Sequence, residues 1–266
     1  MTAAVRRVGI YGGTFNPIHV AHLALAEEIR ERLELERVLF VPSNLPPHKG
    51  THLPSGAERL ALVRLAIRGN PAFGAIDLEV RRGGKSYTVE TLRELAGRLP
   101  AGTELVFLIG MDAFEEIGTW HDADALAAAA HFALFPRPGH PLADPRLHAP
   151  KAWGLAAPRP LPGGGQSWRT SAGTRIFLLP TEQFSIAAST IRARVARGAS
   201  IRYLVPAAVE RAIDRGGLYR FRREQEHNPD GPAAQQGPGA RLANTRRLRR
   251  TSCTPQSAPN SRTRRG

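Results

Sequence analysis

Short apolar runs alternate along the chain with longer segments in which apolar residues recur at helical spacing. The first short run, rich in strand-forming residues, covers residues 5–11 and stops at Gly12 and Gly13. In the charged stretch that follows, apolar residues stand three or four positions apart: Leu23, Ala26, Ile29 and Leu33. Because this spacing places them on one face of a helix, the pattern predicts a strand followed by an amphipathic helix.

The alternation continues for most of the chain. It predicts further strands at residues 37–42, 76–80, 105–109, 132–135 and 176–179. It predicts further helices at residues 58–67, 88–99, 124–130, 190–196 and 206–214. Strands with little polar alternation, most of them followed by a helix, favour a parallel sheet that helices cover on both faces. We therefore expect an α/β fold, a Rossmann-like doubly wound parallel sheet with a small C-terminal helical region, in which ligands bind beyond the carboxyl ends of the strands.

Two regions depart from this alternation. Residues 136–173 are rich in proline, glycine and alanine, and we expect a long surface excursion there, chiefly over residues 147–173. Residues 222–266 contain ten arginines, three acidic residues and no Phe, Tyr or Trp, so they carry +7 of the chain's net charge of +14. Such a segment cannot bury enough apolar surface to offset its ordering entropy. We expect one domain over residues 1–221 and a disordered basic tail over residues 222–266.

Composition excludes several classes of protein. The chain has 266 residues, which is enough for a sizeable core. No apolar stretch approaches the roughly 18 residues of a membrane-spanning helix, and the apolar run after Arg7 is too short for a secretion signal. The single cysteine, Cys253, cannot form an internal disulfide or found a cysteine-based zinc site. We expect a soluble, cytoplasmic protein with no membrane partner.

Two glycine patterns fall short of known nucleotide-binding fingerprints. Residues 83–86 read G-G-K-S, but a P-loop needs a glycine five positions before the second of these glycines, where Glu79 stands. Gly9, Gly12 and Gly13 do not satisfy G-x-G-x-x-G either. The sequence therefore predicts neither a Walker motif nor a dinucleotide-binding loop.

The turn after the first predicted strand is more informative. Residues 12–22 read G-G-T-F-N-P-I-H-V-A-H and lead into the first predicted helix. Glycines let the backbone approach a ligand, and a helix N-terminus presents free N–H groups and a positive dipole end, so this turn favours an anion such as phosphate. His19 and His22 are three positions apart and can point to the same phosphate. The alternatives are two surface histidines at a helix start, or a zinc site, for which no third ligand stands nearby.

This turn resembles the G-G-T-F-[DN]-P-x-H-x-x-H signature of the nucleotidyltransferases related to class I aminoacyl-tRNA synthetases. Other segments resemble one branch of that superfamily, the bacterial nicotinate mononucleotide adenylyltransferases: residues 41–49, 86–92, 107–112, 119–120, 137–139, 186–192 and 217–219. The resemblance covers about residues 5–221 in order. It implies a nucleotidyltransferase domain acting in NAD biosynthesis. The 5′-phosphate of nicotinate mononucleotide would attack the α-phosphorus of ATP, releasing pyrophosphate and forming nicotinate adenine dinucleotide.

The resemblance also implies roles for individual residues. Those that would hold ATP and its phosphates are Gly12, Gly13, Thr14, Phe15, Gly110, Asp112, Ser189 and Arg192. His19 and His22 would be the catalytic pair, stabilising charge on the transferring and leaving phosphates. The nicotinate pocket would consist of Thr88, Trp120, the backbone N–H of His121, and Arg137. Mg²⁺ would enter with ATP, held mainly by phosphates and water, with no metal site on the protein itself.

The chain departs from the family pattern at a few positions. Ala187 stands where the family usually has serine, which removes one hydroxyl that could bind phosphate. We expect the next hydroxyl, that of Ser189, to cap the N-terminus of the following helix. Asn16 replaces the commoner aspartate and Ala21 the usual glycine, and we expect both to be tolerated.

Two other functions stay open. An adenylyltransferase for nicotinamide mononucleotide or another phosphorylated acceptor, such as phosphopantetheine, would share the first motif. The arginine-rich tail favours RNA binding, but arginines without interleaved aromatics give at most weak, salt-sensitive attraction to polyanions and no specific recognition of nucleic acid. The sequence predicts no oligomeric state.

Deleting residues 223–266 is expected to leave the melting temperature and the rate of adenylyl transfer unchanged, because the segment lacks core-forming residues. Retention on heparin at low salt should weaken, since the deletion removes much of the positive charge. Thermal melting, turnover and heparin retention of the two chains check this expectation. A truncated chain that does not fold would mean that the tail packs on the domain.

Overall fold

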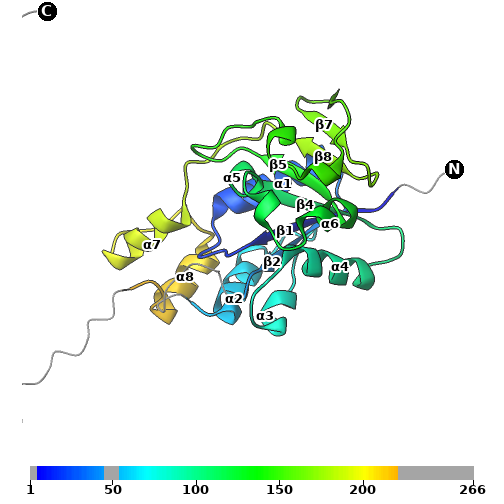
Figure 1. The fold of residues 1–266 in the computed structure, drawn as a ribbon. Coiled ribbons are helices and arrows are strands. Elements are labelled where there is room, and N and C mark those ends of the chain that lie inside the picture. The colour runs from blue at the N-terminus through cyan, green and yellow to red at the C-terminus, as the bar shows by residue number, and fades with distance from the viewer. Residues whose placement is uncertain (1–4, 45–53, 221–266) are drawn as a thin grey trace, which may run out of the picture. The chain divides into compact units, whose positions relative to one another are not determined.

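The computed structural model describes residues 5–44 and 54–220, which form an eight-stranded sheet with helices on both faces (Figure 1). The strands are β1 (Arg7–Gly13), β2 (Arg37–Pro42), β3 (Phe73–Ala75), β4 (Glu104–Gly110), β5 (His131–Phe135), β6 (Arg159–Pro160), β7 (Gln166–Arg169) and β8 (Arg175–Leu178). The α-helices are α1 (Val20–Arg32), α2 (Gly56–Ala66), α3 (Leu78–Arg82), α4 (Thr88–Arg98), α5 (Met111–Phe114), α6 (Ala123–Ala129), α7 (Ala188–Ala196) and α8 (Ala207–Gly216). Short 3-10 helices are η1 (Ile117–Thr119), η2 (Pro145–Leu147) and η3 (Lys151–Trp153). The P-P-H-K motif at residues 46–49 and the tail predicted to be disordered lie outside the described residues.

The sheet has the strand order β3-β2-β1-β4-β5-β8-β7-β6. From β3 to β8 all neighbouring strands are parallel, and Ile10 of β1 pairs with Leu39 of β2 on one side and Phe107 of β4 on the other. β7 runs antiparallel to β8, and β6 runs antiparallel to β7. The predicted doubly wound α/β fold is confirmed, and the two antiparallel strands at one edge make the sheet mixed.

Alternate strand residues point into two apolar cores, one on each face of the sheet. In β4, Val106 and Leu108 belong to the core that contains residues of α1, α2, α7 and α8. Phe107 and Ile109, between and after them, belong to the core that contains residues of α3, α4, α5 and α6. Since successive strand side chains point to opposite faces, a strand buried on both faces must be apolar along its buried length, as residues 105–110 of β4 are.

The third strand lies earlier in the chain than the sequence pattern predicts. The prediction of a strand at residues 76–80 is wrong, because β3 is Phe73–Ala75 and Leu78–Arg82 form α3. In so short an apolar run, periodicity does not separate a strand from a buried helical turn. The true strand contains Gly74, where a Cβ would lie 2.8 Å from Cδ2 of Leu39. Glycine therefore allows the close approach of β3 to β2, although its presence lowers the strand signal.

Residues 147–173 lie mostly on the surface, but they are more regular and better anchored than their composition predicts. The segment contributes β6 and β7 to the sheet, and its tryptophans, Trp153 and Trp168, are 0% and 1% exposed. The indole N–H of Trp153 donates to the carbonyl of Ala123 at 3.0 Å, and its ring packs on that of Phe132 with centroids 5.0 Å apart. Two isolated aromatic residues among prolines and glycines give no periodic pattern, so the composition predicts neither the two strands nor the buried tryptophans.

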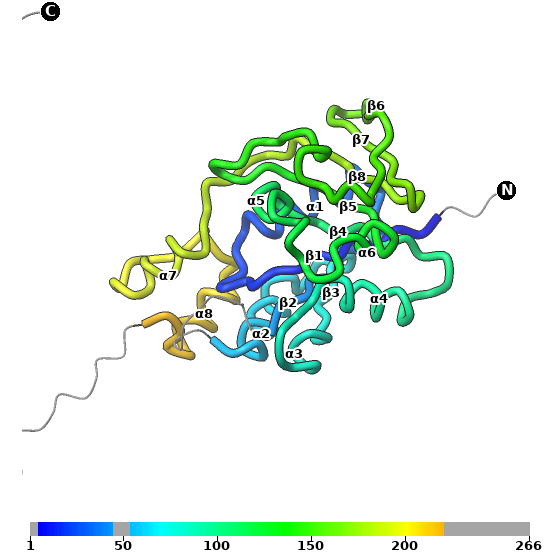
Figure 2. Tube along the Cα trace, in the orientation of Figure 1, coloured from blue at the N-terminus to red at the C-terminus, as the bar shows by residue number. Residues whose placement is uncertain are grey.

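The two C-terminal helices lie at the end of the sheet toward which β1 runs (Figure 2). The N–H of Val20, at the start of α1, donates to the carbonyl of Leu204 at 3.1 Å. Helix α8 packs against α2, and Ile191 of α7 is fully buried in the core beside α1. The predicted C-terminal helical region is confirmed, and it borders the carboxyl ends of the parallel strands.

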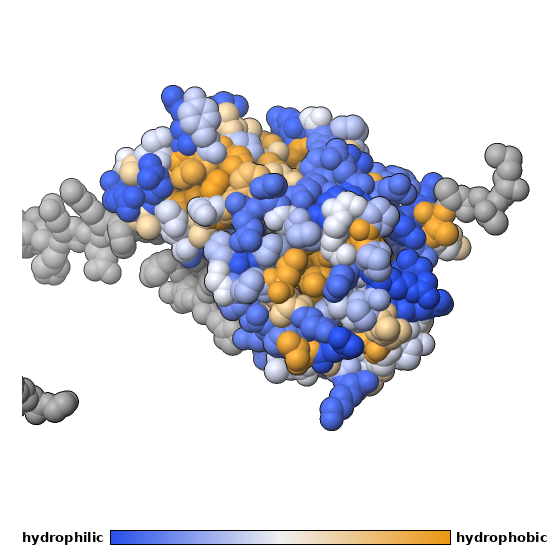
Figure 3. Space-filling model, turned by 90° about the horizontal axis from the view of Figure 1, so that it is seen from above, coloured by the Kyte–Doolittle hydropathy of each residue, from blue (hydrophilic) through white to orange (hydrophobic). Residues whose placement is uncertain are grey.

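Few large apolar side chains reach the surface of the described residues. Those that are exposed are Val5, Leu147, Phe184 and Tyr203. Seen from above, the apolar areas of the surface are separate patches among polar side chains (Figure 3). Within residues 5–44 and 54–220, no helix has the length and apolar character needed to cross a membrane.

Candidate active site

The candidate site lies at the carboxyl ends of β1 and β4, where the order of strands in the sheet changes direction. From β1 the chain adds β2 and β3 on one side, and it then returns to add β4, β5 and β8 on the other. The connections that leave β1 and β4 therefore diverge, and the carboxyl ends of these two neighbouring strands border a crevice of the kind that holds ligands in open α/β sheets. Residues 12–22 leave β1 and residues 110–112 leave β4 at this edge.

The turn after β1 has two consecutive backbone N–H groups that point away from the segments holding its carbonyls. The N–H of Ser43 donates to the carbonyl of Gly13 at 3.0 Å, and the guanidinium of Arg59 donates to the carbonyl of Thr14 at 2.6 Å. Both peptides are trans, so the N–H groups of Thr14 and Phe15 point away from these partners. Phe15 has a φ of 46°, and left-handed residues make successive N–H groups converge on an anion. Neither N–H has an acceptor among the described residues.

Both predicted histidines lie at the start of α1 and are buried. His19 is 2% exposed and His22 is 9% exposed, and their rings stack with centroids 3.7 Å apart. The backbone N–H of His19 donates to Nδ1 of His22 at 3.3 Å. Because Nδ1 accepts this hydrogen bond, a neutral His22 ring carries its proton on Nε2. This burial does not fit the alternative of two surface histidines.

Burial also keeps both imidazoles uncharged. Burial and the nearby charge of Arg137 lower the pKa of His19 to about 4. Burial, His19 and Arg137 together hold the pKa of His22 well below its ordinary value. Among the described residues Nδ1 of His19 is buried without a hydrogen-bond partner. At neutral pH the pair therefore offers neutral N–H donors beside a fixed positive charge, which suits a phosphate.

Gly110 and Asp112, at the end of β4, lie next to Arg137, which comes after β5. Nε of Arg137 lies 3.7 Å from Oδ1 of Asp112, and its guanidinium lies over the ring of Phe135 at 5.7 Å from the centroid. A Cβ at Gly110 would overlap Oδ1 of Asp112 and would lie 3.0 Å from the side chain of Arg137. A larger residue at position 110 would therefore displace the Asp112 carboxyl or the Arg137 side chain. The sequence-based assignment of Arg137 to the nicotinate pocket is not matched by its contacts, which group it with the predicted ATP-binding residues.

An open cleft lies beside these groups. Its lining includes Tyr11, His22, Phe135, Arg137 and Phe184. The hydroxyl of Tyr11 and Nε of Arg137 are buried and have no hydrogen-bond partner among the described residues. Burial raises the pKa of Tyr11 to about 12, so its hydroxyl keeps its proton. A cleft that combines aromatic walls with unpaired donors fits a ligand that has both a planar apolar part and polar oxygens.

The other predicted nicotinate residues, Thr88, Trp120 and His121, come together at a second place along the same edge. Thr88 is the first residue of α4, and the residue before it, Tyr87, stacks its ring on that of His121 with centroids 4.2 Å apart. Trp120 precedes His121 and meets the ring of Phe107 edge-on at 6.3 Å. The N–H of His121 has no acceptor among the described residues. An indole face and a free N–H thus lie close to the N-terminus of a helix.

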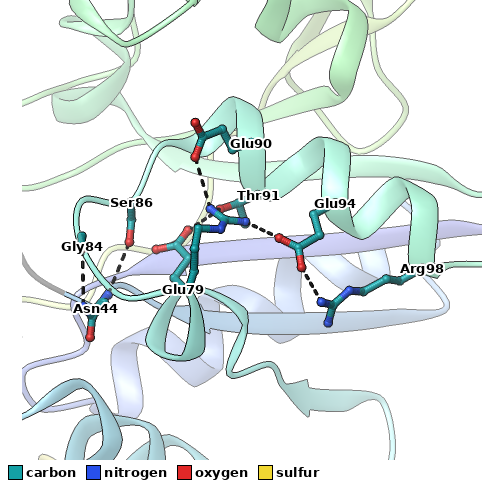
Figure 4. A network of polar contacts seen from close by, with 9 residues as sticks. Asn44, Glu79, Gly84, Ser86, Glu90, Thr91, Glu94 and Arg98 are labelled. Carbon is teal, nitrogen blue, oxygen red and sulfur yellow. Dashed lines mark hydrogen bonds and ion pairs between the residues drawn. The ribbon is translucent and has the colours of Figure 1, made fainter.

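A polar network fixes the segment before α4 to the end of β2. The backbone N–H of Asn44 donates to Oγ of Ser86 at 3.5 Å, and its side-chain amide donates to the carbonyl of Gly84 at 3.4 Å (Figure 4). In the same network Oγ1 of Thr91 donates to the carboxyl of Glu79 at 2.8 Å. Glu79 is 8% exposed, and burial raises its pKa. The helix start that carries the predicted nicotinate contact is therefore held on two sides.

The prediction that Ser189 caps a helix is wrong. α7 begins at Ala188, and the first helical hydrogen bond runs from the N–H of Ile191 to the carbonyl of Ala187, so Ser189 is already inside the first turn and is exposed. Arg192, the other predicted phosphate ligand from this helix, donates to the carbonyl of Asn16 at 2.8 Å. The structure thus brings Arg192 to the β1–α1 turn and leaves Ser189 on the surface.

One further buried residue, Arg59, was missed by the sequence analysis. It is 1% exposed and lies in α2. It stands three and four positions before Leu62 and Val63, which are buried in the core. The available signal was a charged residue on the apolar face of a predicted helix. Its guanidinium donates to the carbonyls of Thr14, Ser43, Asn44 and Pro54 at 2.6, 2.6, 2.7 and 3.2 Å.

Several known proteins are similar to this chain in sequence or in fold. The cytidylyltransferase-like family matches residues 10–194. A probable nicotinate-nucleotide adenylyltransferase of Trichlorobacter lovleyi is 43% identical over 215 residues, which cover 80% of this chain and 99% of the relative. Its counterpart in Geobacter sulfurreducens is 42% identical over 214 residues, 80% of this chain and 98% of the relative. A Plasmodium falciparum nicotinic acid mononucleotide adenylyltransferase, solved in complex with NaAD, has a TM-score of 0.61 at 18% identity and covers 80% of this chain and 97% of its own.

Proposed function

The chain belongs to the nicotinate-nucleotide adenylyltransferases, within the cytidylyltransferase-like family, and from this premise we propose that it transfers the adenylyl group of ATP to nicotinate mononucleotide. The observation that carries the proposal is the pair of buried, uncharged histidines stacked beside a turn with two free N–H groups. Such a group of donors matches a phosphate that gains charge during the reaction.

In the proposed reaction a 5′-phosphate oxygen of nicotinate mononucleotide forms a bond to the α-phosphorus of ATP. The bond from the α-phosphorus to the bridging oxygen breaks, and pyrophosphate leaves with that electron pair. Nucleotidyl transfer needs little covalent chemistry from the protein, so the contribution of the site is positioning and charge stabilisation. The N–H groups of Thr14 and Phe15 would hold the α-phosphate, and Gly110 and Asp112 would receive the adenosine ribose.

His19 and His22 would act as neutral donors. Because the pKa values of both rings are low, neither ring carries a positive charge at neutral pH. A full positive charge there would attract the phosphates of the substrate and of the transition state equally well. A donor fixed by stacking and burial reorganises little as charge moves onto the phosphates. Arg137 would supply the fixed positive charge beside them, and Arg192 would hold the turn through the carbonyl of Asn16.

Mg²⁺ would reach this site as part of the ATP complex. Within residues 5–44 and 54–220, no three histidine, cysteine or carboxylate side chains are grouped so that they could hold a metal ion. The carboxyl of Asp112 at the crevice already faces Arg137 at 3.7 Å. Phosphate oxygens and water are the ligands that Mg²⁺ uses in such complexes, where it offsets the charge of the phosphates. We therefore propose Mg·ATP as the substrate.

Nicotinate mononucleotide is expected to be preferred over nicotinamide mononucleotide by at least about tenfold in kcat/KM. The N–H of His121 has no acceptor among the described residues, and it can donate to a carboxylate in either orientation of the ring. The amide presents its own N–H₂ in one of the two orientations, which leaves a donor facing a donor. Pyrophosphate release measured with each mononucleotide, and with phosphopantetheine as a third acceptor, checks the preference.

Trp120→Ala supplies the companion test of the acceptor pocket. The substitution removes the stacking surface and is expected to lower kcat/KM for both mononucleotides without reversing their order. Equal rates with the two mononucleotides in the unmutated enzyme would contradict the choice of acceptor. Turnover only with phosphopantetheine would contradict it as well, while leaving adenylyl transfer in place.

A further inference from the structure

Arg59 binds three separate segments of the chain from one buried position in α2. Its guanidinium donates to the carbonyl of Thr14 in the turn after β1, and to the carbonyls of Ser43 and Asn44 after β2. Its Nε donates to the carbonyl of Pro54 ahead of α2. These acceptors carry no formal charge, so the positive charge of the guanidinium is not cancelled by the groups that it contacts.

The contact with Thr14 decides where the next N–H points. The carbonyl of Thr14 faces Arg59, and the trans peptide directs the N–H of Phe15 the opposite way, away from Arg59. Ser43 is held by Arg59 through its carbonyl and binds the carbonyl of Gly13 through its own N–H. Arg59 therefore acts on both peptides whose N–H groups face the phosphate site, once directly and once through Ser43.

We propose that Arg59 is a positioning residue for adenylyl transfer, which holds the N–H groups of Thr14 and Phe15 toward the α-phosphate and places an uncancelled positive charge behind that turn. The proposal rests on the proposed function of the site. It gives a reason for a fully buried arginine on the apolar face of α2, where a leucine would pack without the cost of burying a charge. It also explains why the left-handed φ of Phe15 is maintained.

Arg59→Lys tests the proposal, with Arg64→Lys in the same helix as the matched control. Lysine keeps the charge but lacks the planar fork that spans several carbonyls, so the turn should lose its fixed geometry. Arg64 is exposed and lies 3.8 Å from Asp77, outside the site. We expect kcat per folded molecule to fall between about 10- and 100-fold in Arg59→Lys, with a smaller change in KM for the acceptor, and to stay unchanged in Arg64→Lys.

The folded fraction of each variant is measured by tryptophan fluorescence at the assay temperature. Arg59→Lys that melts earlier but turns over like the unmutated enzyme per folded molecule would overturn the proposal, because Arg59 would then serve stability alone. Absence of adenylyl transfer in the unmutated enzyme would instead reject the proposed function, so the two failures are distinguishable.

A second measurement on the unmutated chain covers the case in which Arg59→Lys does not fold. Mg·ATP is added without an acceptor, and the backbone ¹⁵N–¹H resonances are followed by NMR. The N–H signals of Thr14 and Phe15 are expected to move together as the nucleotide binds. Saturating binding that shifts other residues of the crevice but leaves both of these signals in place would mean that the N–H groups do not face the phosphate, and it would overturn the proposal.

Discussion

His19→Ala is expected to lower kcat by about 10²- to 10³-fold while leaving the fold intact. The imidazole of His19 is 2% exposed, uncharged at neutral pH and stacked on His22, so its alanine variant loses a donor that is fixed before the reaction begins. The helix start should survive, because the backbone N–H of His19 and not its side chain donates to His22. Steady-state rates and thermal melting of the variant are compared with those of the unmutated enzyme.

His148→Ala is the matched control for this substitution. His148 is half-buried at the end of η2 and does not line the cleft, so its replacement should leave kcat unchanged. A stable, fully active His19→Ala enzyme would exclude the proposed role of the histidine pair. An equal loss of activity in both variants would point to a general disturbance and not to a lost donor.

Trp153→Ala is expected to lower the free energy of unfolding by about 3–5 kcal/mol, the usual cost of truncating a fully buried aromatic residue. Trp153 is 0% exposed, its ring packs on Phe114 and Phe132, and its indole N–H donates to the carbonyl of Ala123. The substitution opens a cavity and leaves that carbonyl without its partner. Denaturant unfolding curves of the two proteins measure the difference.

Tyr203→Ala provides the comparison for this prediction. Tyr203 is 85% exposed, and its truncation should change the free energy of unfolding by no more than about 0.5 kcal/mol. A Trp153→Ala protein that loses less than about 1 kcal/mol would mean that residues 147–173 pack loosely on the sheet. It would also mean that the buried ring of Trp153 does little to anchor this segment.

Local sequence patterns predict those helices and strands whose burial can be read from their own residues. After their first residues, β2 and β4 are apolar because helices cover both faces of the sheet, and that is visible in the residues themselves. β3 is three residues long and contains a glycine that contacts Leu39, so its signal lies in a neighbouring strand. Trp153 and Trp168 likewise find their surroundings in segments far along the chain.

The candidate site likewise has one part that the local sequence predicts and one part that it does not. The turn with His19 and His22 is a continuous motif, so the residues alone predict an anion site there. Arg59 reaches the same turn from a helix 45 positions away, and Arg192 reaches it from 176 positions away. Both bind backbone carbonyls, which every residue has, so no side-chain type at the receiving end marks the contact in the sequence.

The N–H groups of Thr14 and Phe15, which we propose face the phosphate, belong to the main chain, and this changes what a mutational scan of the site would report. No side-chain substitution other than proline removes a backbone N–H, so the groups that would touch the nucleotide are largely invisible to alanine replacement. Damage would appear instead at Arg59 and at Gly110, which hold or make room for the site. A ranking of positions by loss of activity would therefore identify the residues that support the proposed phosphate site. It would miss the backbone N–H groups that donate to the phosphate.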